Sequence, residues 1–198
     1  MGSDHNAITV PELYFFTIER FRIMNAKKIL YNSIYKLMQE NRIEKITVDM
    51  ILKESEVSRA TFYRHFRDKF DLINWYHASF VEKELFHSDQ SWEQIIYKAA
   101  VFMLENKHFY FKAVKFQGQN SLNEFILKYY TSFVEARYKK GSGQTTLSVK
   151  EQLAIAYHCS GAVRIFNEWV SGGMAIPPEE LTDYFCDLIH DELRKVLE

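Results

Sequence analysis

The sequence contains few of the residues that mark secreted, disulfide-stabilised or membrane-spanning proteins. Its 198 residues include only two cysteines, three prolines and seven glycines. No apolar run is long enough to cross a bilayer, and no basic and then apolar leader precedes a small-residue cleavage site. We therefore expect a cytoplasmic protein in which Cys159 and Cys186 are small buried thiols; a redox pair between them is the alternative.

Motifs for catalysis and metal binding are also missing. The seven histidines are scattered without HExxH or paired-cysteine spacing. There is no Gly-rich phosphate loop, no nucleophile elbow and no carboxylate pair whose placement the sequence fixes. We therefore expect no metal site, no cofactor and no enzymatic activity. An enzyme that turns over a small molecule is the third and least favoured functional alternative.

The residues that are present predict an all-α fold with about nine main helices. Hydrophobic residues make up 47% of the chain and aromatic residues 16%, which is ample for a core. Apolar residues recur with helical spacing, and no strand alternation or internal repeat is visible. The first expected helix runs from Ala26 to Glu40 and is capped by Asn25, and further helices are expected within residues 47–84. The remaining expected helices are Ser91–Glu105, Lys107–Phe116, Ser121–Tyr138, Val149–Ser171 and Pro178–Leu197.

The charge is balanced overall but unevenly distributed. The formal net charge is −1. Residues 25–80 hold ten Lys and Arg against seven Asp and Glu, a net of +3, while residues 81–198 hold thirteen against sixteen, a net of −3. A local basic surface in the first third is what contact with phosphate requires.

Residues 47–71 are the most informative stretch. Thr47 and Ser58 are suitable N-caps for two short helices, and Glu56 and Val57 form the corner between them. In the second helix, Arg59 to Phe66, the aromatic rings of Phe62 and Phe66 share one face. The remaining positions offer Arg59, Thr61, Tyr63, Arg64 and His65. This arrangement predicts a helix-turn-helix whose second helix reads the major groove of DNA.

The segment VSRATFYRHFRDKFDLI closely resembles the signature of the TetR family of transcriptional regulators, and elements coincide in order from Ala26 to Asp71. Two positions depart from the family pattern, since Asn41 and Glu56 stand where these proteins usually have Gly. We expect Glu56 to need a positive φ, which costs a residue with a Cβ about 1 kcal/mol. The resemblance implies an N-terminal extension (1–24), a DNA-binding domain (25–71) and an effector-binding and dimerisation domain (72–198).

The resemblance also assigns roles to the residues of the helix-turn-helix. It places Arg59, Ala60 and Thr61 near base edges. Six further residues are expected to bind DNA: Thr47, Ser58, Tyr63, Arg64, His65 and Lys69. Of these, Tyr63, His65 and Lys69 are expected to contact phosphates, and Thr47 is expected to position the N-terminus of its helix at a phosphate. Arg20 and Arg22 could reach DNA from an N-terminal arm, although packing of this segment against the body is the favoured alternative.

The second half is similar, more loosely, to TetR regulators of the dihydroxyacetone-kinase type. The matching segments are HFYFKAV at 108–114, Gln119-Asn120-Ser121, Gly161, and Trp169 before Gly172-Gly173-Met174 with Pro178-Glu179-Glu180. Because TetR-like proteins dimerise through their last two long helices, the family resemblance implies a homodimer; packing of these residues in the protein's own core is the alternative. Small residues would let a helix of the second subunit approach closely, and the last helix would add an apolar stripe. The small residues are Ala154, Ala156, Ser160, Gly161 and Ala162, and the stripe consists of Leu181, Tyr184, Phe185, Leu188 and Leu193.

An apolar ligand pocket is expected between the middle helices. Its candidate residues are Phe102, Phe109, Phe125, Tyr129, Tyr130, Phe133, His158, Arg164 and Asn167, and ordinary core packing is the alternative for each. The resulting hypothesis is a homodimeric repressor that a small-molecule effector releases from a pseudo-palindromic double-stranded DNA operator. An adaptor whose head binds a protein instead of DNA is the second function that we consider.

Overall fold

The computed structural model describes residues 10–85 and 90–197, and within helices it leaves out the side chains of residues 10–22, 24 and 195. These described residues form helices and turns without a strand, which confirms the predicted all-α class. The elements are α1 (Val10–Glu40), η1 (Ile43–Lys45), α2 (Val48–Ser55), α3 (Arg59–His65), α4 (Lys69–Phe80), η2 (Val81–Leu85), α5 (Trp92–Glu105), α6 (Lys107–Ala113), α7 (Leu122–Ser142), α8 (Val149–Ser171), α9 (Pro178–Asp187) and α10 (Asp191–Leu197).

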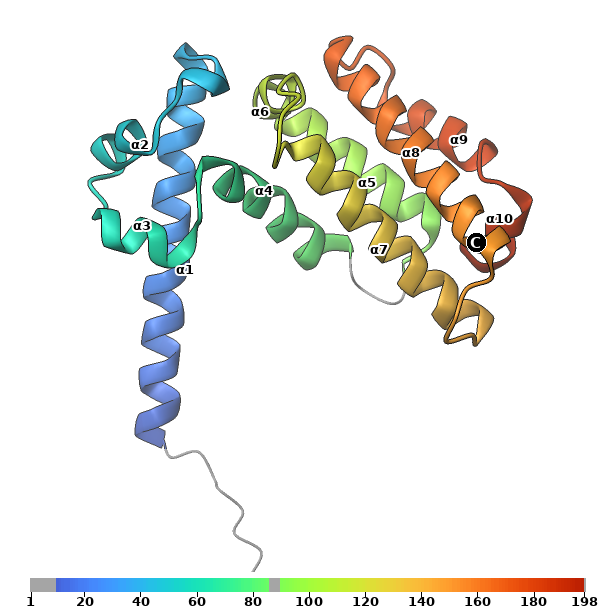
Figure 1. Ribbon diagram of the computed structural model, residues 1–198, viewed down its shortest axis with the longest axis horizontal. Helices are drawn as coiled ribbons and strands as arrows, with labels where there is room; N and C mark the ends of the chain where they lie inside the picture. Colours follow the sequence, from blue (N-terminus) through green and yellow to red (C-terminus); the bar gives the residue numbers. More distant parts are fainter. Residues whose placement is uncertain (1–9, 86–89, 198) are drawn as a thin grey trace, which may run out of the picture.

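Helices α1 to α3 form a small head at one end of the molecule (Figure 1). Leu30 and Ile34 of α1 are fully buried, as are Ile51 of α2 and Phe62 of α3. The second half of α1 thus supplies the wall against which the two shorter helices pack. The predicted N-caps Thr47 and Ser58 are confirmed, because their side chains accept hydrogen bonds from backbone N–H groups three residues later. Asp68 caps α4 in the same way.

The predicted helix start at Asn25 is wrong, because α1 continues without interruption from Val10. Pro11 lies in its first turn, where a missing N–H has no carbonyl to pair with. Asn25 is exposed within the helix, where its modest propensity cost does not stop a long run. The predicted domain boundary at residue 24 therefore falls inside α1. The predictions for Arg20 and Arg22 concern side chains that lie outside the described ones.

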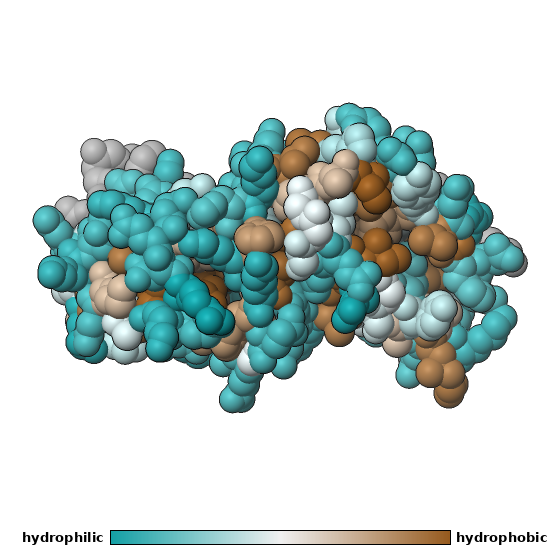
Figure 2. Space-filling model, turned by 90° about the horizontal axis from the view of Figure 1, so that it is seen from above, coloured by the Kyte–Doolittle hydropathy of each residue, from teal (hydrophilic) through white to brown (hydrophobic). Residues whose placement is uncertain are grey.

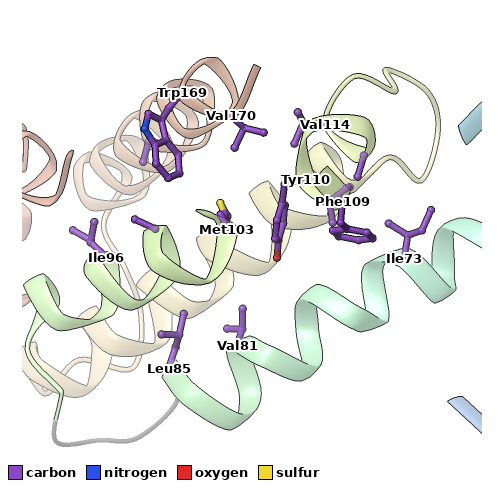
Figure 3. Close-up of a cluster of buried hydrophobic side chains, with 14 of the residues drawn as sticks. Ile73, Val81, Leu85, Ile96, Met103, Phe109, Tyr110, Val114, Trp169 and Val170 are labelled. Carbon is purple, nitrogen blue, oxygen red and sulfur yellow. The ribbon is translucent and has the colours of Figure 1, made fainter. Parts of the chain in front are cut away.

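The body consists of α5 and of α7 to α10 (Figure 1). Helix α7 packs against α8, α5 packs against α9, and α10 packs against both α7 and α8. Helix α4 leads from the head to the body. Figure 3 shows where it ends in the core: Val81 and Leu85 of η2 face Met103 of α5 and Tyr110 of α6, with Trp169 and Val170 of α8 behind them. The core is therefore continuous from α4 through the body.

Three predicted helices have different ends in the structure. Helix α7 ends at Ser142, four residues beyond its predicted end at Tyr138. The expected helix Pro178–Leu197 is two helices, α9 and α10, separated at residues 188–190. No Gly or Pro marks this break; instead the guanidinium of Arg194 turns back and donates to the carbonyls of Cys186 (2.9 Å) and Ile189 (3.3 Å). Helix α6 ends at Ala113, three residues before its predicted end.

The head and body meet at an aromatic junction. The rings of Tyr31 (α1) and Tyr76 (α4) stack with their centroids 3.8 Å apart. Tyr76 also packs on Phe109 of α6 and donates its hydroxyl to Asn106 Oδ1 at 2.7 Å. Lys112 of α6 donates to the carbonyls at the C-terminal end of α1, including that of Gln39 at 2.9 Å. The position of the head is thus tied to α4 and α6.

Candidate nucleic-acid interface and internal cavity

Helix α3 has one buried and one exposed face. Phe62 and Phe66 are at most 3% exposed, whereas Tyr63 is 51% exposed. Arg59, Ala60 and Arg64 are also exposed, and Thr61 and His65 are half-buried. The predicted division into a core face and an outer face is therefore confirmed, and the outer face is polar and basic.

The corner before α3 has the backbone conformation that the sequence predicted. Glu56 has φ 56° and ψ 15°, which is left-handed. A side chain with a Cβ disfavours this region, so the corner carries a local strain that Gly would not. The Glu56 side chain is exposed beside the N-terminus of α3, which gives this surface a negative charge at its edge.

An ion pair joins the two helices of the corner. The guanidinium of Arg59 contacts the carboxylate of Asp49 in the first turn of α2, and both side chains are more than half exposed. Thr61 Oγ1 lies 2.9 Å from Ser58 Oγ. Two of the three residues expected at base edges are therefore engaged within the head in this structure. An exposed pair of this kind contributes little to stability and is readily exchanged for another partner.

Lys69 has an environment that the sequence did not indicate. Its ammonium group donates to the carbonyl oxygens of Ile43 (2.7 Å), Glu44 (3.3 Å) and Ile46 (2.6 Å). Partial burial lowers the pKa of Lys69. The lysine thus fastens the start of α4 to the η1 segment that precedes α2. This contact joins residues more than 20 positions apart, so local spacing could not have revealed it.

His65, at the C-terminal end of α3, is half-buried. Burial, followed by the nearby positive charges of Lys27 and Arg64, lowers the pKa of its imidazole. The neutral form is therefore favoured further at pH 7. A neutral His65 can donate one ring N–H to a phosphate oxygen but adds no charge to the surface.

An internal cavity of about 90 Å³ lies between α4, η2, α5, α7 and α8. Of the predicted pocket residues, Phe102, Tyr129, Tyr130, Phe133 and Asn167 line it. The other four do not. Phe109 is fully buried in the junction, Phe125 lines an outer groove, His158 lies behind Tyr130 with Nε2 3.2 Å from its hydroxyl, and Arg164 is on the surface, paired with Glu168 at 2.7 Å.

The sequence missed the contribution of α4 and η2 to this cavity. His77, Phe80 and Val81 line it, and His77 Nδ1 lies 2.9 Å from the hydroxyl of Tyr110. Complete burial lowers the pKa of His77 to about 4, so its ring is neutral at pH 7. Polar groups in a mainly apolar lining can orient a ligand. The sequence analysis did not mark His77, because a single histidine in a helix gives no signal for the neighbours that enclose it.

The outer side of α8 and α9 presents exposed apolar side chains. Val149, Leu153 and Tyr157 follow one another at four-residue spacing on α8 and are 71%, 65% and 80% exposed. Leu188, just after α9, is 64% exposed. Of the residues expected at an interface, Ala156, Ser160, Gly161 and Tyr184 are also exposed, whereas Ala162, Leu181, Phe185 and Leu193 are buried and Ala154 is half-buried. Figure 2 shows hydrophobic residues on the surface of the body, while the head is mainly hydrophilic in the same view.

Residues 10–85 and 90–197 contain no group of three or more His, Cys, Asp or Glu side chains placed to hold a metal ion. None of the described helices is both long and apolar enough to span a membrane.

Comparisons with known proteins agree with this geometry. A family model described as bacterial regulatory proteins, tetR family, matches residues 30–74, and one described as a transcriptional regulator C-terminal region matches residues 90–191. Two solved structures resemble the fold, each with a TM-score of 0.61. The dihydroxyacetone kinase operon activator DhaS is 22% identical and the match covers 87% of this chain and 98% of that one. A TetR transcriptional regulator from Streptococcus agalactiae 2603V is 19% identical over 88% and 98%. No curated protein sequence matches the chain.

Proposed function

The chain belongs to the TetR family of transcriptional regulators, and we propose that it is a homodimeric repressor that a small-molecule effector releases from a pseudo-palindromic DNA operator. The observation that carries this proposal is the outer face of α3, a capped helix that presents Arg59, Ala60, Tyr63 and Arg64 to solvent. A short helix with this exposed basic face fits the major groove of B-DNA.

Within this interface, Arg59, Ala60 and Thr61 are proposed to contact base edges, and six further residues to position the head on the backbone: Thr47, Ser58, Tyr63, Arg64, His65 and Lys69. Support comes from the N-termini of α2 and α3, which both begin with a capped, exposed turn. Helix N-termini attract phosphate groups. Arg59 must leave Asp49 to reach a base, and Lys69 must leave the carbonyls of η1 to reach a phosphate.

A twofold dimer is proposed to form through the apolar surface of α8 and α9. Exposed side chains such as Leu153 and Tyr157 are costly to leave in water when they form one patch. An isologous contact through this patch would relate the two heads by a twofold axis, as a pseudo-palindromic operator requires. Full affinity then requires the heads to meet successive major grooves, about 34 to 36 Å apart.

The effector is proposed to bind at the cavity between α4 and the body, because α4 connects this cavity to the head. A cavity of about 90 Å³ has room for only a few water molecules, so a ligand must push its walls apart. Displacement of α4 would move the head that it carries. A ligand that binds the displaced state better shifts the population away from DNA.

Repression is proposed because steric exclusion of RNA polymerase needs only the DNA contact, whereas activation needs an additional contact surface. One solved relative, DhaS, is named an operon activator. Transcription in vitro from a promoter that carries the selected operator distinguishes repression from activation. Lower transcript yield on adding the protein supports repression, and a higher yield overturns it.

The DNA-binding proposal is tested by selecting sequences from a random duplex library with the purified protein. We expect a pseudo-palindrome, and Arg59→Ala should relax discrimination at one base step in each half-site without abolishing binding to random DNA. Failure to enrich any sequence, together with salt-insensitive binding, would overturn the proposal in favour of a protein-binding head.

The dimer is tested by light scattering during size-exclusion chromatography. Tyr157→Glu places a charge in the exposed α8 patch and should give a monomer that binds DNA only weakly. Phe111→Glu is the matched control, because Phe111 is a partly exposed aromatic residue on α6, outside the patch. A wild-type protein that is monomeric at micromolar concentration contradicts the proposed dimer.

A further inference from the structure

An open groove follows the length of α7 on the outside of the body. Its volume is about 960 Å³, and it extends from Arg67, between α3 and α4, to Val196 of α10. Neither the family matches nor the proposed dimer surface assigns a role to it. Its lining combines two features that rarely occur together on an ordinary solvated helix face, a row of cations and a row of aromatic rings.

The described lining of the groove carries a row of cations. Arg67, Lys128, Arg137 and Lys140 belong to it, and no Asp or Glu among the described residues does. Lys128 and Lys140 are exposed, and neither belongs to any ion pair found among the described residues. These two lysines are twelve positions apart and therefore lie about 18 Å from each other along α7, and both border the groove.

The two ends of the groove differ in their surroundings. At the end near Lys128, the adjoining depression is lined by Asp68, Asp71 and Glu124, and Arg67 lies 3.7 Å from Asp71. At the other end, the guanidinium of Arg137 is held in place by donating to the carbonyls of Gln90 (3.0 Å) and Leu197 (3.2 Å). Arg137 and Lys140 together form the more strongly positive end.

The aromatic row lies between these ends. Phe125, Tyr129 and Phe133 follow at four-residue spacing on α7, directly before Arg137 in the same row. Tyr129 and Phe133, together with Leu85, also line the internal cavity. The groove and the cavity therefore share a wall, and an apolar body on the rings lies at the entrance to the core.

We propose that this groove binds an amphipathic anion, with its carboxylate, sulfonate or phosphate group at Arg137 and Lys140 and its apolar body on Tyr129 and Phe133, extending towards the cavity. The inference rests on the proposed function, since it names the chemical class of the effector. Arg67 directly follows the recognition segment, so the groove reaches the junction with the head. An occupant would thereby connect the ligand site to the head as well as to α4.

The test uses two fluorescent probes of similar shape. Anilinonaphthalene sulfonate carries a negative charge, whereas N-phenyl-1-naphthylamine is neutral. We expect the sulfonate to bind more tightly, and Lys140→Gln to weaken its binding by about two- to fivefold while leaving that of the neutral probe unchanged. Lys128→Gln should have a smaller effect than Lys140→Gln. Lys98→Gln, which removes an exposed lysine of α5, is the matched control and should have none.

Competition and salt provide independent readouts on the same wild-type protein. Decanoate should displace the sulfonate probe at a lower concentration than 1-decanol does, and raising the salt concentration should reduce this preference. Equal binding of both probes, equal displacement by both competitors, or equal effects of Lys140→Gln and Lys98→Gln would overturn the inference. Unchanged unfolding midpoints of the variants exclude a general loss of structure.

The proposed function and the proposed anion site can each be rejected without rejecting the other. DNA affinity of the ligand-free protein is measured on the same samples, and Lys140→Gln should leave it within about twofold of the wild-type value. Specific DNA binding without preference for the anionic probe would reject only the groove. Anion-selective binding without any DNA binding would reject the regulator and keep the groove as a ligand site.

Discussion

The ammonium group of Lys69 donates a hydrogen bond to the backbone carbonyl of Ile46 at 2.6 Å, across 23 positions of the chain. It also donates to Ile43 and Glu44, so three carbonyls of the segment before α2 converge on one side chain at the start of α4. The position of the helix-turn-helix relative to α4 therefore depends on a lysine that the sequence assigned to DNA alone.

Replacing Lys69 by Met should lower the free energy of unfolding by about 1 to 2 kcal/mol, because a charged donor with three acceptors is lost. Urea denaturation measures this change. Lys53→Met, which removes an exposed lysine of α2, is the control and should change stability little. If Lys69→Met leaves stability unchanged but lowers the slope of DNA affinity against salt by nearly one unit per head, then phosphate contact is its whole role.

Glu56→Gly should raise the free energy of unfolding by about 1 kcal/mol, because Gly adopts the left-handed conformation of the corner without a Cβ conflict. The same change removes a negative charge beside α3 and should strengthen operator binding. Lys53→Gly is the matched control within α2, where Gly should destabilise the helix by a similar amount. A loss of both stability and DNA affinity in Glu56→Gly would contradict this interpretation of the corner.

The sequence predicted features that depend on a few neighbouring residues. The caps at Thr47 and Ser58 and the strained corner at Glu56 were predicted, because each depends only on residues within four positions. The start of α1 and the division between α9 and α10 were not. At α1 the local signal was misleading, because Asn25 is a suitable N-cap residue but lies inside a continuous helix. Between α9 and α10 no Gly or Pro marks the break, which is held by a contact from Arg194.

The cavity could be predicted only in part, for a related reason. Helical spacing shows that Phe102, Phe109 and Phe133 are all apolar and inward, but not which of them border an open space. Phe109 instead packs at the head and body junction, 5.1 Å from Tyr76 between ring centroids. The way α4 crosses the body determines which side chains border the cavity. It also places His77 in the cavity wall, and no pattern in the sequence marked His77 as a pocket residue.

His77 should make the protein less stable in mild acid. Burial lowers its pKa to about 4 in the folded state, against about 6.5 in the unfolded chain. Between these values only the unfolded chain takes up the proton, so the stability present above pH 6.5 is lost as the pH falls towards 4. The loss from pH 7 to pH 5 should be about 2 kcal/mol.

Urea denaturation at pH 7 and pH 5 measures the loss of stability. His77→Gln should reduce it by about 2 kcal/mol and leave the part that comes from the other histidines with lowered pKa values, His65 and His158. His108→Gln is the control, since His108 is exposed and should leave the pH dependence unchanged. An equal pH dependence in wild type and His77→Gln would show that the buried ring is not the responsible group.

Asp49→Asn should strengthen binding to DNA of any sequence, on the order of tenfold at low salt, because Arg59 loses its partner in α2 and becomes free for phosphate. Fluorescence polarisation with random and operator duplexes measures both affinities. Glu54→Gln is a matched control: it removes an acidic residue from the same helix, but its partner is Lys36 of α1 at 2.6 Å, and Arg59 stays paired. If Asp49→Asn and Glu54→Gln raise DNA affinity equally, the change in net charge explains the effect. A gain confined to Asp49→Asn, larger for random DNA than for the operator, indicates that Asp49 limits non-specific binding by holding Arg59 until a matching base draws it away.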